Sequence, residues 1–286
     1  MKPITENQIE EYALTELQAL GYSYVHGVVI SPGGEGQERE SFEQIILIDR
    51  LRNAVARINP HIPLDAREQA VQKTVRLYSP DMKAANEEFH SYLIEKVKVP
   101  YTEDGFERSH EVALIDFENI DNNEFLAVNQ FTITENNQNK RPDVLLFVNG
   151  IPLVVIELKN ATDENATMQG AFNQIETYKA TIPSPFNYNS FSVIADGFDA
   201  KAGTISAGLS RFMAWKSADS QKDASKFTPQ LDTMIKGMLR RDILLDLVRN
   251  FIVFERSTVH DKKTGQTQIV SIKKLAAYHQ YYAVNK

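Results

Sequence analysis

The chain has 286 residues, 42% of them hydrophobic, no cysteine, and a formal net charge of -7 at pH 7. This length and apolar content suit one large domain, or a domain with a smaller appendage, around a buried core. The lack of cysteine excludes disulfides, thiolate metal sites and a cysteine nucleophile, and the six histidines have no zinc-ligand spacing. Without a signal peptide or an apolar run of roughly 18 residues, the chain is expected to be cytoplasmic and to have no membrane contact.

The N-terminal part is predicted to be mainly helical. Residues 5–20 carry an apolar stripe at helical spacing, Thr5 and Gln8 have capping-box spacing, and Gly21 ends the helix. A strand is expected over residues 22–30. Two further stretches are expected to be mainly helical, over residues 41–57 and 64–98.

From about residue 110 the pattern changes to short segments rich in β-branched and aromatic residues, separated by polar turns, which is typical of strands. We expect strands over residues 112–117, 124–134, 144–148, 153–158 and 190–195, and a helix over about 166–180. The remainder, about 226–286, is expected to be largely helical, with a final helix from about Lys273. This order of elements predicts a mixed α/β core with helices on both sides of a central sheet.

Charged residues lie at the open end of an apolar hairpin. Asn149-Gly150 between two apolar runs is a strong hairpin signal, with Asp143 on one arm and Glu157 and Lys159 on the other. Residues two apart on a strand share a face, so Glu157 and Lys159 point the same way. Buried carboxylates are costly unless paired or bound to metal, so Asp143 beside Glu157 is a candidate magnesium site. A hairpin whose charged ends bind nothing is the alternative.

The register of this hairpin decides whether the site can exist. With Asn149 and Gly150 as a two-residue turn, position 143 faces position 156, and Asp143 and Glu157 lie on opposite faces. A three-residue turn or a one-residue bulge shifts the partner of 143 to 157. Pro152 cannot donate a ladder hydrogen bond and is a reason for such an irregularity. The site therefore requires an irregular hairpin.

These residues carry a family resemblance. Pro142-Asp143 followed by Glu157-x-Lys159 resembles the PD-(D/E)XK nuclease motif, and Gln174 and Tyr178 on the next helix resemble the QxxxY motif found beside the nuclease centre in several such families. Over nearly its whole length the chain resembles the nuclease region of type I restriction enzyme R (motor) subunits. The further matching segments are Asn129-Gln130-Phe131-Thr132, Asn149-Gly150-Ile151-Pro152 and residues 250–255.

The resemblance implies a restriction-endonuclease-like α/β fold, with additional N-terminal and C-terminal helical segments, and hydrolysis of DNA phosphodiester bonds. Asp143 and Glu157 would bind Mg²⁺, for which Mn²⁺ could substitute, and Lys159 would orient or help deprotonate the attacking water and stabilise charge on the phosphate. Gln174 and Tyr178 would support Lys159 or contact a DNA phosphate. A purely packing role is the alternative for these two residues.

In such nucleases a carboxylate from an early helix usually completes the metal site, and Glu10 and Glu11 are the candidates here. At about 100° per residue, Glu10 falls about 45° from the centre of the apolar stripe, whereas Glu11 lies well outside it. The family's spacing of this glutamate from Leu20-Gly21-Tyr22 also points to Glu10. A rim carboxylate paired with a lysine is the alternative for Glu10.

The resemblance also implies an endonuclease domain over residues 1–225 and a helical linker over 226–286 that leads to an ATP-driven DNA translocase. The chain has no G-x-x-x-x-G-K-[ST] phosphate loop, and its end resembles the segment that precedes that loop, so we expect a truncated piece of a longer protein. ATP binding and helicase activity would belong to that full-length parent. Double-stranded DNA would be the substrate, and the methyltransferase and specificity subunits would be the partners.

Three hypotheses stay open. The chain is a magnesium-dependent endonuclease region that cuts after ATP-driven translocation, a nuclease-fold docking module that couples the motor to its partners without cutting, or a stand-alone repair or junction nuclease, which the C-terminus argues against. The acidic net charge is unusual for a DNA-binding surface. It fits either a local basic groove or DNA held mainly by partners and by other parts of the parent protein.

Overall fold

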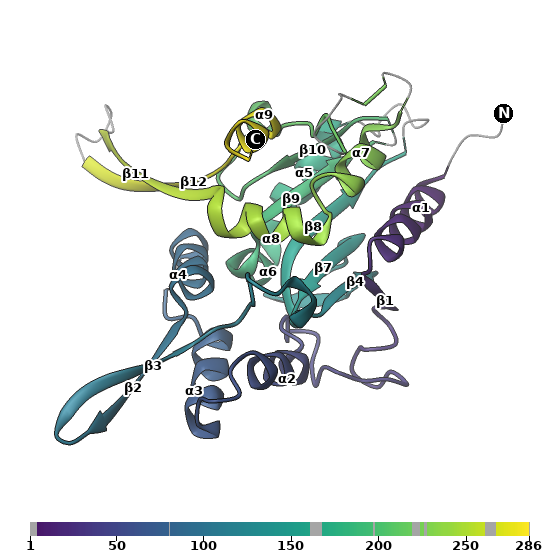
Figure 1. The fold of residues 1–286 in the computed structure, drawn as a ribbon. Coiled ribbons are helices and arrows are strands. Elements are labelled where there is room, and N and C mark those ends of the chain that lie inside the picture. Colours follow the sequence, from purple (N-terminus) through teal and green to yellow (C-terminus); the bar gives the residue numbers. More distant parts are fainter. Residues whose placement is uncertain are drawn as a thin grey trace.

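The computed structural model describes residues 5–79, 81–160, 168–196, 198–218, 224–225, 228–260 and 267–285. Its centre is a six-stranded mixed sheet (Figure 1). In spatial order the strands are β1 (Ser23–His26), β4 (Phe125–Asn129), β7 (Val144–Val148), β8 (Ile151–Leu158), β9 (Phe191–Ala195) and β10 (Ala200–Gly203). The β1–β4 and β8–β9 pairs are parallel, and the other neighbours are antiparallel.

Every residue of the four central strands is buried. Their sequences are near-continuous apolar runs, as expected for strands covered on both faces. The covering helices include α1 (Glu6–Ala19), α5 (Met168–Thr181), α6 (Ser184–Tyr188) and α7 (Gln230–Lys236). Helix α1 packs against β1, β8 and α7, and α5 packs against β8 and β9. The mixed α/β core with flanking helices is therefore confirmed.

Three hairpin turns share one chemistry. The turn residues Asp104-Gly105, Asn136-Asn137 and Asn149-Gly150 all have positive φ, which is the type I′ geometry that matches strand twist. They join β2 (Val97–Glu103) to β3 (Phe106–Val112), β5 (Ile133–Glu135) to β6 (Gln138–Lys140), and β7 to β8. The β2–β3 hairpin projects from the body of the molecule (Figure 1).

Several predicted elements of the N-terminal half need correction. The strand expected over 22–30 is only β1, because turns occupy residues 27–30, and no strand runs over 113–117 among the described residues. Residues 97–112 form the β2–β3 hairpin, although residues 97 and 98 were included in a helical stretch. The Asp104-Gly105 turn signal explains this hairpin. The helices there are α2 (Ile48–Ile58), α3 (Leu64–Val75) and α4 (Met82–Glu95).

The prediction of a largely helical C-terminal region is wrong. After α7 and α8 (Arg241–Asn250), the long antiparallel hairpin β11 (Ile252–His260) and β12 (Thr267–Leu275) precedes α9 (Tyr278–Val284). Lys273 therefore lies in a strand. The alternation of β-branched and polar residues in β12 overrides the helical interpretation. Two short 3-10 turns, Ile120–Asn122 and Leu209–Arg211, complete the elements of the described residues.

The C-terminal elements share the core of the sheet. Met234, Leu239 and Leu244 belong to the same buried cluster as the residues of β7 and β8. The division between 1–225 and 226–286 stays a prediction, and residue 226 lies outside the described residues, as does the expected helix start at 166. Among the residues that the structure describes, none forms a helix long and apolar enough to span a membrane.

Candidate active site

The β7–β8 hairpin is irregular, as the site requires. Asn149 and Gly150 form the turn, and a Cβ at Gly150 would lie 2.5 Å from the carbonyl oxygen of Leu47, so only glycine fits. Phe147 pairs with Pro152, but Leu146 pairs with Val154. The skipped residue, Leu153, is the extra residue of a β-bulge, and from there the pairing continues to Val144 and Ile156. Position 143 therefore faces position 157, which confirms the predicted shift of register.

The bulge brings Asp143 to the end of β8. The backbone N–H of Leu158 donates to Oδ2 of Asp143 at 2.7 Å. Glu157, the neighbouring residue, is only 1% exposed, and its Oε2 is buried without a hydrogen-bond partner. A buried carboxylate oxygen without a donor is costly, and a bound cation would satisfy it.

The electrostatics of this carboxylate pair follow from burial. Burial raises the pKa of Asp143 to about 6, against the opposing effects of the Leu158 N–H and the Lys159 charge. Burial, and then the negative charge of Asp143, raise the pKa of Glu157 to about 8, although Lys159 opposes this. The single positive charge of Lys159 thus does not offset the burial of two carboxylates, which is the condition that a divalent cation relieves.

Lys159 is the cation nearest to this pair. Its Nζ donates to Oε1 of Glu157 at 2.6 Å and to Oε1 of Glu6 at 3.1 Å. Burial disfavours the charge of Lys159, but Glu157 outweighs it and holds the lysine pKa above its usual value. Its backbone N–H donates to the carbonyl of Ala195 at the end of β9, which fixes the lysine beside the strand end.

Glu10 faces the same strand ends from helix α1. Its two carboxylate oxygens accept hydrogen bonds from the side-chain amides of Asn129, at 2.6 Å, and Gln130, at 2.9 Å. The negative charge of Glu10 contributes to the raised pKa of Asp143. Glu11, by contrast, is exposed. Glu10, rather than Glu11, therefore lies against the end of β4, next to the beginning of β7.

Gln174 and Tyr178 lie on the face of α5 that packs toward β8. Tyr178 is 3% exposed, and its hydroxyl donates to the carbonyl of Arg141 at 3.3 Å. Burial, with the charge of Glu157 next, raises the pKa of Tyr178, whereas a hydrogen bond with Gln174 opposes the rise. The two motif residues thus contact each other beside the Glu157 carboxylate.

The donor set fits a hard divalent cation, because carboxylate oxygens are the ligands that Mg²⁺ prefers. Asp143 and Glu157 supply oxygens at one strand end, and the buried Oε2 of Glu157 lacks a partner. The third carboxylate, that of Glu10, does not form a preformed cluster with these two. Among the described residues, no group of three or more His, Asp or Glu side chains meets the spacing of a preformed metal site. Glu10 is held instead by Asn129 and Gln130.

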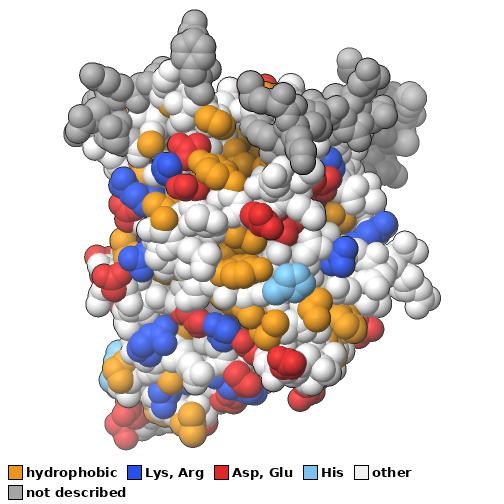
Figure 2. Space-filling view, turned by 90° about the vertical axis from the view of Figure 1, so that its right-hand side faces the viewer, with side chains coloured by type: hydrophobic (Ala, Val, Ile, Leu, Met, Phe, Trp, Pro, Cys, Tyr) orange, Lys and Arg blue, Asp and Glu red, His pale blue; other side chains and the backbone are white. Residues whose placement is uncertain are grey.

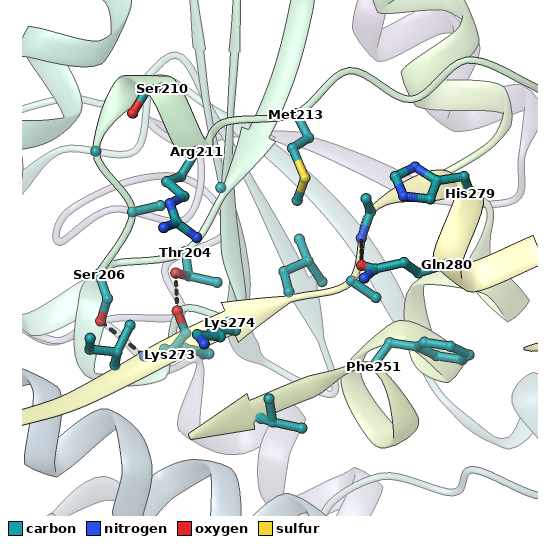
Figure 3. Close-up of a pocket in the computed structure, with 18 of the residues that line it drawn as sticks. Thr204, Ser206, Ser210, Arg211, Met213, Phe251, Lys273, Lys274, His279 and Gln280 are labelled. Atoms are coloured by element: carbon teal, nitrogen blue, oxygen red, sulfur yellow. Dashed lines mark hydrogen bonds between the residues drawn. The ribbon is translucent and has the colours of Figure 1, made fainter. Parts of the chain in front are cut away.

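A large cavity lies elsewhere in the described part of the structure. It has a volume of about 960 Å³ and lies mainly between two stretches of the chain, residues 203–213 and residues 272–284 (Figure 3). Arg211, Lys274 and His279 line it, but no carboxylate does so among the described residues, so this cavity offers no oxygen ligand set for Mg²⁺. On the face shown in Figure 2, the described Lys and Arg side chains are interspersed with Asp and Glu.

A mixed sheet flanked by helices, with paired carboxylates and a lysine at one strand end, has the architecture of a nuclease-like α/β domain. The model of the N-terminal region of type I restriction enzyme R proteins matches residues 3–211, and the chain belongs to this family. It is 40% identical to the HindI endonuclease subunit of Haemophilus influenzae, over 99% of this chain and 26% of that subunit.

A protein of Methanocaldococcus jannaschii, named by inference as the MjaIXP endonuclease subunit of a type I restriction enzyme, is 33% identical over 97% of this chain and 27% of its own length. The EcoprrI endonuclease subunit of Escherichia coli is 32% identical over 52% of this chain and 48% of that protein. The chain thus spans about a quarter of the length of the first two relatives.

Sequence reasoning missed two features of the site. Glu6 lies one helical turn before Glu10 and contacts Lys159, and helical spacing of four residues was the available signal. Asn129 and Gln130 belong to a segment that resembles the family, but no role was predicted for them, although both contact Glu10. Their sequence gave no sign of this contact, because 119 and 120 residues separate the partners.

Proposed function

We propose that this chain is the endonuclease region of a type I restriction enzyme R subunit and that it hydrolyses phosphodiester bonds of double-stranded DNA with Mg²⁺. The observation that carries the proposal is the irregular β7–β8 register, which brings Asp143 to the end of β8 beside the buried Glu157. Only one of the two carboxylate oxygens of Glu157 has a hydrogen-bond partner. A hairpin without a bulge would place these carboxylates on opposite faces. The family membership agrees with a restriction function.

In this proposal Asp143 and Glu157 hold the cation, and Glu10 completes the site from α1. Bound Mg²⁺ would polarise the phosphoryl oxygen and promote deprotonation of the attacking water. Mn²⁺ would substitute, because both ions accept carboxylate oxygens.

Lys159 acts as the positive group of the site. With a cation held by Asp143 and Glu157, the Lys159 ammonium, which contacts Glu157 Oε1, would be placed to orient the water and to stabilise charge on the phosphate. Tyr178 and Gln174 would support the end of β8 from α5, and Glu6 contacts the Lys159 ammonium from α1.

The proposed assembly is larger than this chain. DNA translocation and ATP hydrolysis would reside in other parts of the full-length R subunit, with ATP as its cofactor, and methyltransferase and specificity subunits would be its partners. On the face shown in Figure 2, the described acidic and basic side chains are interspersed, which agrees with DNA held mainly by those other parts, because a continuous basic surface is the usual footprint of DNA binding.

A second candidate function is a docking module that keeps the nuclease fold but does not cut. The observation that favours it is the lack, among the described residues, of three acidic or histidine side chains at metal-binding spacing. Titration calorimetry of the chain with MnCl₂ separates the two. Binding that disappears in Asp143→Asn and Glu157→Gln supports the endonuclease, and no binding to the wild-type chain supports docking.

A further inference from the structure

Asn129 and Gln130 lie where β4 ends, next to the beginning of β7. The amide nitrogen of Asn129 donates to Oε1 of Glu10 at 2.6 Å, and that of Gln130 donates to Oε2 at 2.9 Å. Two consecutive residues therefore satisfy the two oxygens of one carboxylate, which fixes both its position and its rotation.

The backbone of Gln130 ties this arrangement to Asp143. Gln130 has φ 53°, in the left-handed region that side chains other than glycine rarely adopt, and its N–H donates to the carbonyl oxygen of Asp143 at 3.1 Å. The same residue thus contacts Glu10 through its side chain and Asp143 through its backbone. Such unfavourable backbone conformations persist where the surrounding structure requires them, often at functional sites.

Tyr24 on β1 orients the Asn129 amide. Its hydroxyl donates to Oδ1 of Asn129 at 3.1 Å, so the amide nitrogen of Asn129 must point the other way, toward Glu10. Tyr24 is 38% exposed, and its hydrogen bond reaches Glu10 through Asn129.

The partners of Glu10 differ in charge from those of Glu157 and Glu6. Glu157 and Glu6 both contact the Lys159 ammonium. Within the described part of the chain, the hydrogen bonds to the Glu10 side chain come from neutral amides. Neutral donors orient a carboxylate without cancelling its charge, so its remaining lone pairs stay available to a cation.

We propose that Asn129 and Gln130 are positioning residues that hold the Glu10 carboxylate toward Asp143 for a divalent cation. This inference rests on the proposed metal site and goes beyond it, because it names what fixes the third carboxylate. Asn129 and Gln130 themselves do not touch the cation. Their hydrogen bonds restrict the conformations of the Glu10 side chain, in the way that the outer hydrogen-bond partners of metal ligands orient those ligands.

The test is calorimetric titration of the chain with MnCl₂. Asn129→Leu and Gln130→Met remove the donors at similar volume and should weaken Mn²⁺ binding by about 10–100-fold. Tyr24→Phe, which leaves the ring in place, should weaken it by a smaller factor. The matched control Gln18→Met changes an exposed glutamine of α1 and should bind as wild type. Thermal melts establish that each variant is folded, and Tyr24→Phe carries the test if a buried variant fails to fold.

A double-mutant cycle with Glu10→Gln shows whether the effect passes through Glu10. If it does, Asn129→Leu adds no further loss of Mn²⁺ affinity in the Glu10→Gln background. Fully additive losses, or wild-type affinity in Asn129→Leu, Gln130→Met and Tyr24→Phe, overturn the inference. If binding is lost in Asp143→Asn but unchanged in these variants, only the positioning role fails. A wild-type chain that binds no Mn²⁺ overturns the metal site and this inference with it.

Discussion

Asp143 accepts a hydrogen bond from the backbone N–H of Leu158 at 2.7 Å, across a hairpin whose regular register would have kept the two apart. The contact exists because Leu153 is unpaired in the β7–β8 ladder. One extra residue in a strand thus decides that Asp143 and Glu157 lie at the same strand end. The consequences for stability, metal binding and cleavage can be measured separately.

Glu157→Gln should stabilise the metal-free chain at high pH. A folded-state pKa of about 8 lies above the ordinary value of 4.5, so the folded protein prefers protonated Glu157 and loses stability as pH rises between these values. Glutamine mimics the protonated form. In EDTA we expect the free energy of unfolding of the variant to exceed that of wild type by roughly 2 kcal/mol at pH 8.5, with little difference at pH 4.5.

Urea unfolding at the two pH values measures this difference. Glu11→Gln, an exposed change on α1, is the control and should leave the pH dependence unaltered. Equal stabilities of Glu157→Gln and wild type at pH 8.5 would show that burial does not disfavour the Glu157 charge.

Metal affinity should fall with acidification. Protons compete with the cation at Glu157, whose pKa is raised to about 8, and at Asp143, whose pKa is raised to about 6. The dissociation constant for Mn²⁺ should increase about tenfold per pH unit from pH 8 toward pH 6, and more steeply below, where both carboxylates take up protons. Calorimetric titration at four pH values tests this, and a pH-independent affinity would rule out these two residues as the ligands.

Lys273 should make stability depend on pH in the opposite sense. Its Nζ is buried between Oδ1 of Asn86 and the carbonyl of Asn189, each at 2.8 Å, and burial lowers its pKa to about 7. Hydrogen bonds to Thr204 and Ser206 hold its backbone at the edge of the large cavity (Figure 3). Because the unfolded lysine keeps a proton up to about pH 10, folding gains stability as pH rises from about 7 toward 10.

Lys273→Met should remove that gain, so that the free energy of unfolding in urea is no higher at pH 9.5 than at pH 7, and only the decrease due to Glu157 up to about pH 8 remains. Lys274→Met, at the exposed neighbouring position, is the matched control and should retain the wild-type slope. An unchanged slope in Lys273→Met would mean that another group titrates.

Tyr178→Phe should reduce cleavage without unfolding the chain. The ring fills the same buried space, but the hydroxyl that contacts the Arg141 carbonyl and Gln174 beside Glu157 is lost. We expect DNA cleavage by the full-length assembly to slow by about 10–100-fold, as for other groups that support metal ligands. The melting temperature monitors folding. Wild-type cleavage by Tyr178→Phe would assign this residue to packing alone.

Local chemistry made the site hairpin predictable. Asn149-Gly150 specifies a tight turn, Pro152 interrupts the ladder, and the two apolar arms identify buried strands. These signals lie within about 20 residues of one another, so they require no knowledge of the tertiary fold. Asp104-Gly105 is a turn signal of the same type. It closely follows a stretch that was expected to be helical, so the hairpin around it was not predicted.

Features that depend on tertiary contacts were not predictable. The sequence of β11 and β12 suited a helix as well as strands, and the pairing of these two segments along nine positions resolves this ambiguity. The contacts of Glu10 with Asn129 and Gln130 join residues that meet only after the sheet has formed. The buried Lys273 likewise depends on α4 and on the segment before β9.

The most direct test of the proposed function is DNA cleavage by the complete enzyme carrying Asp143→Ala or Lys159→Ala, measured beside its ATP hydrolysis. We expect cleavage to fall by at least about 100-fold in each variant, because a metal ligand or the positive group of the site is lost. ATP hydrolysis should continue at the wild-type rate, since the proposal assigns it to another part of the protein. Cleavage at wild-type rates in either variant would contradict the proposed site.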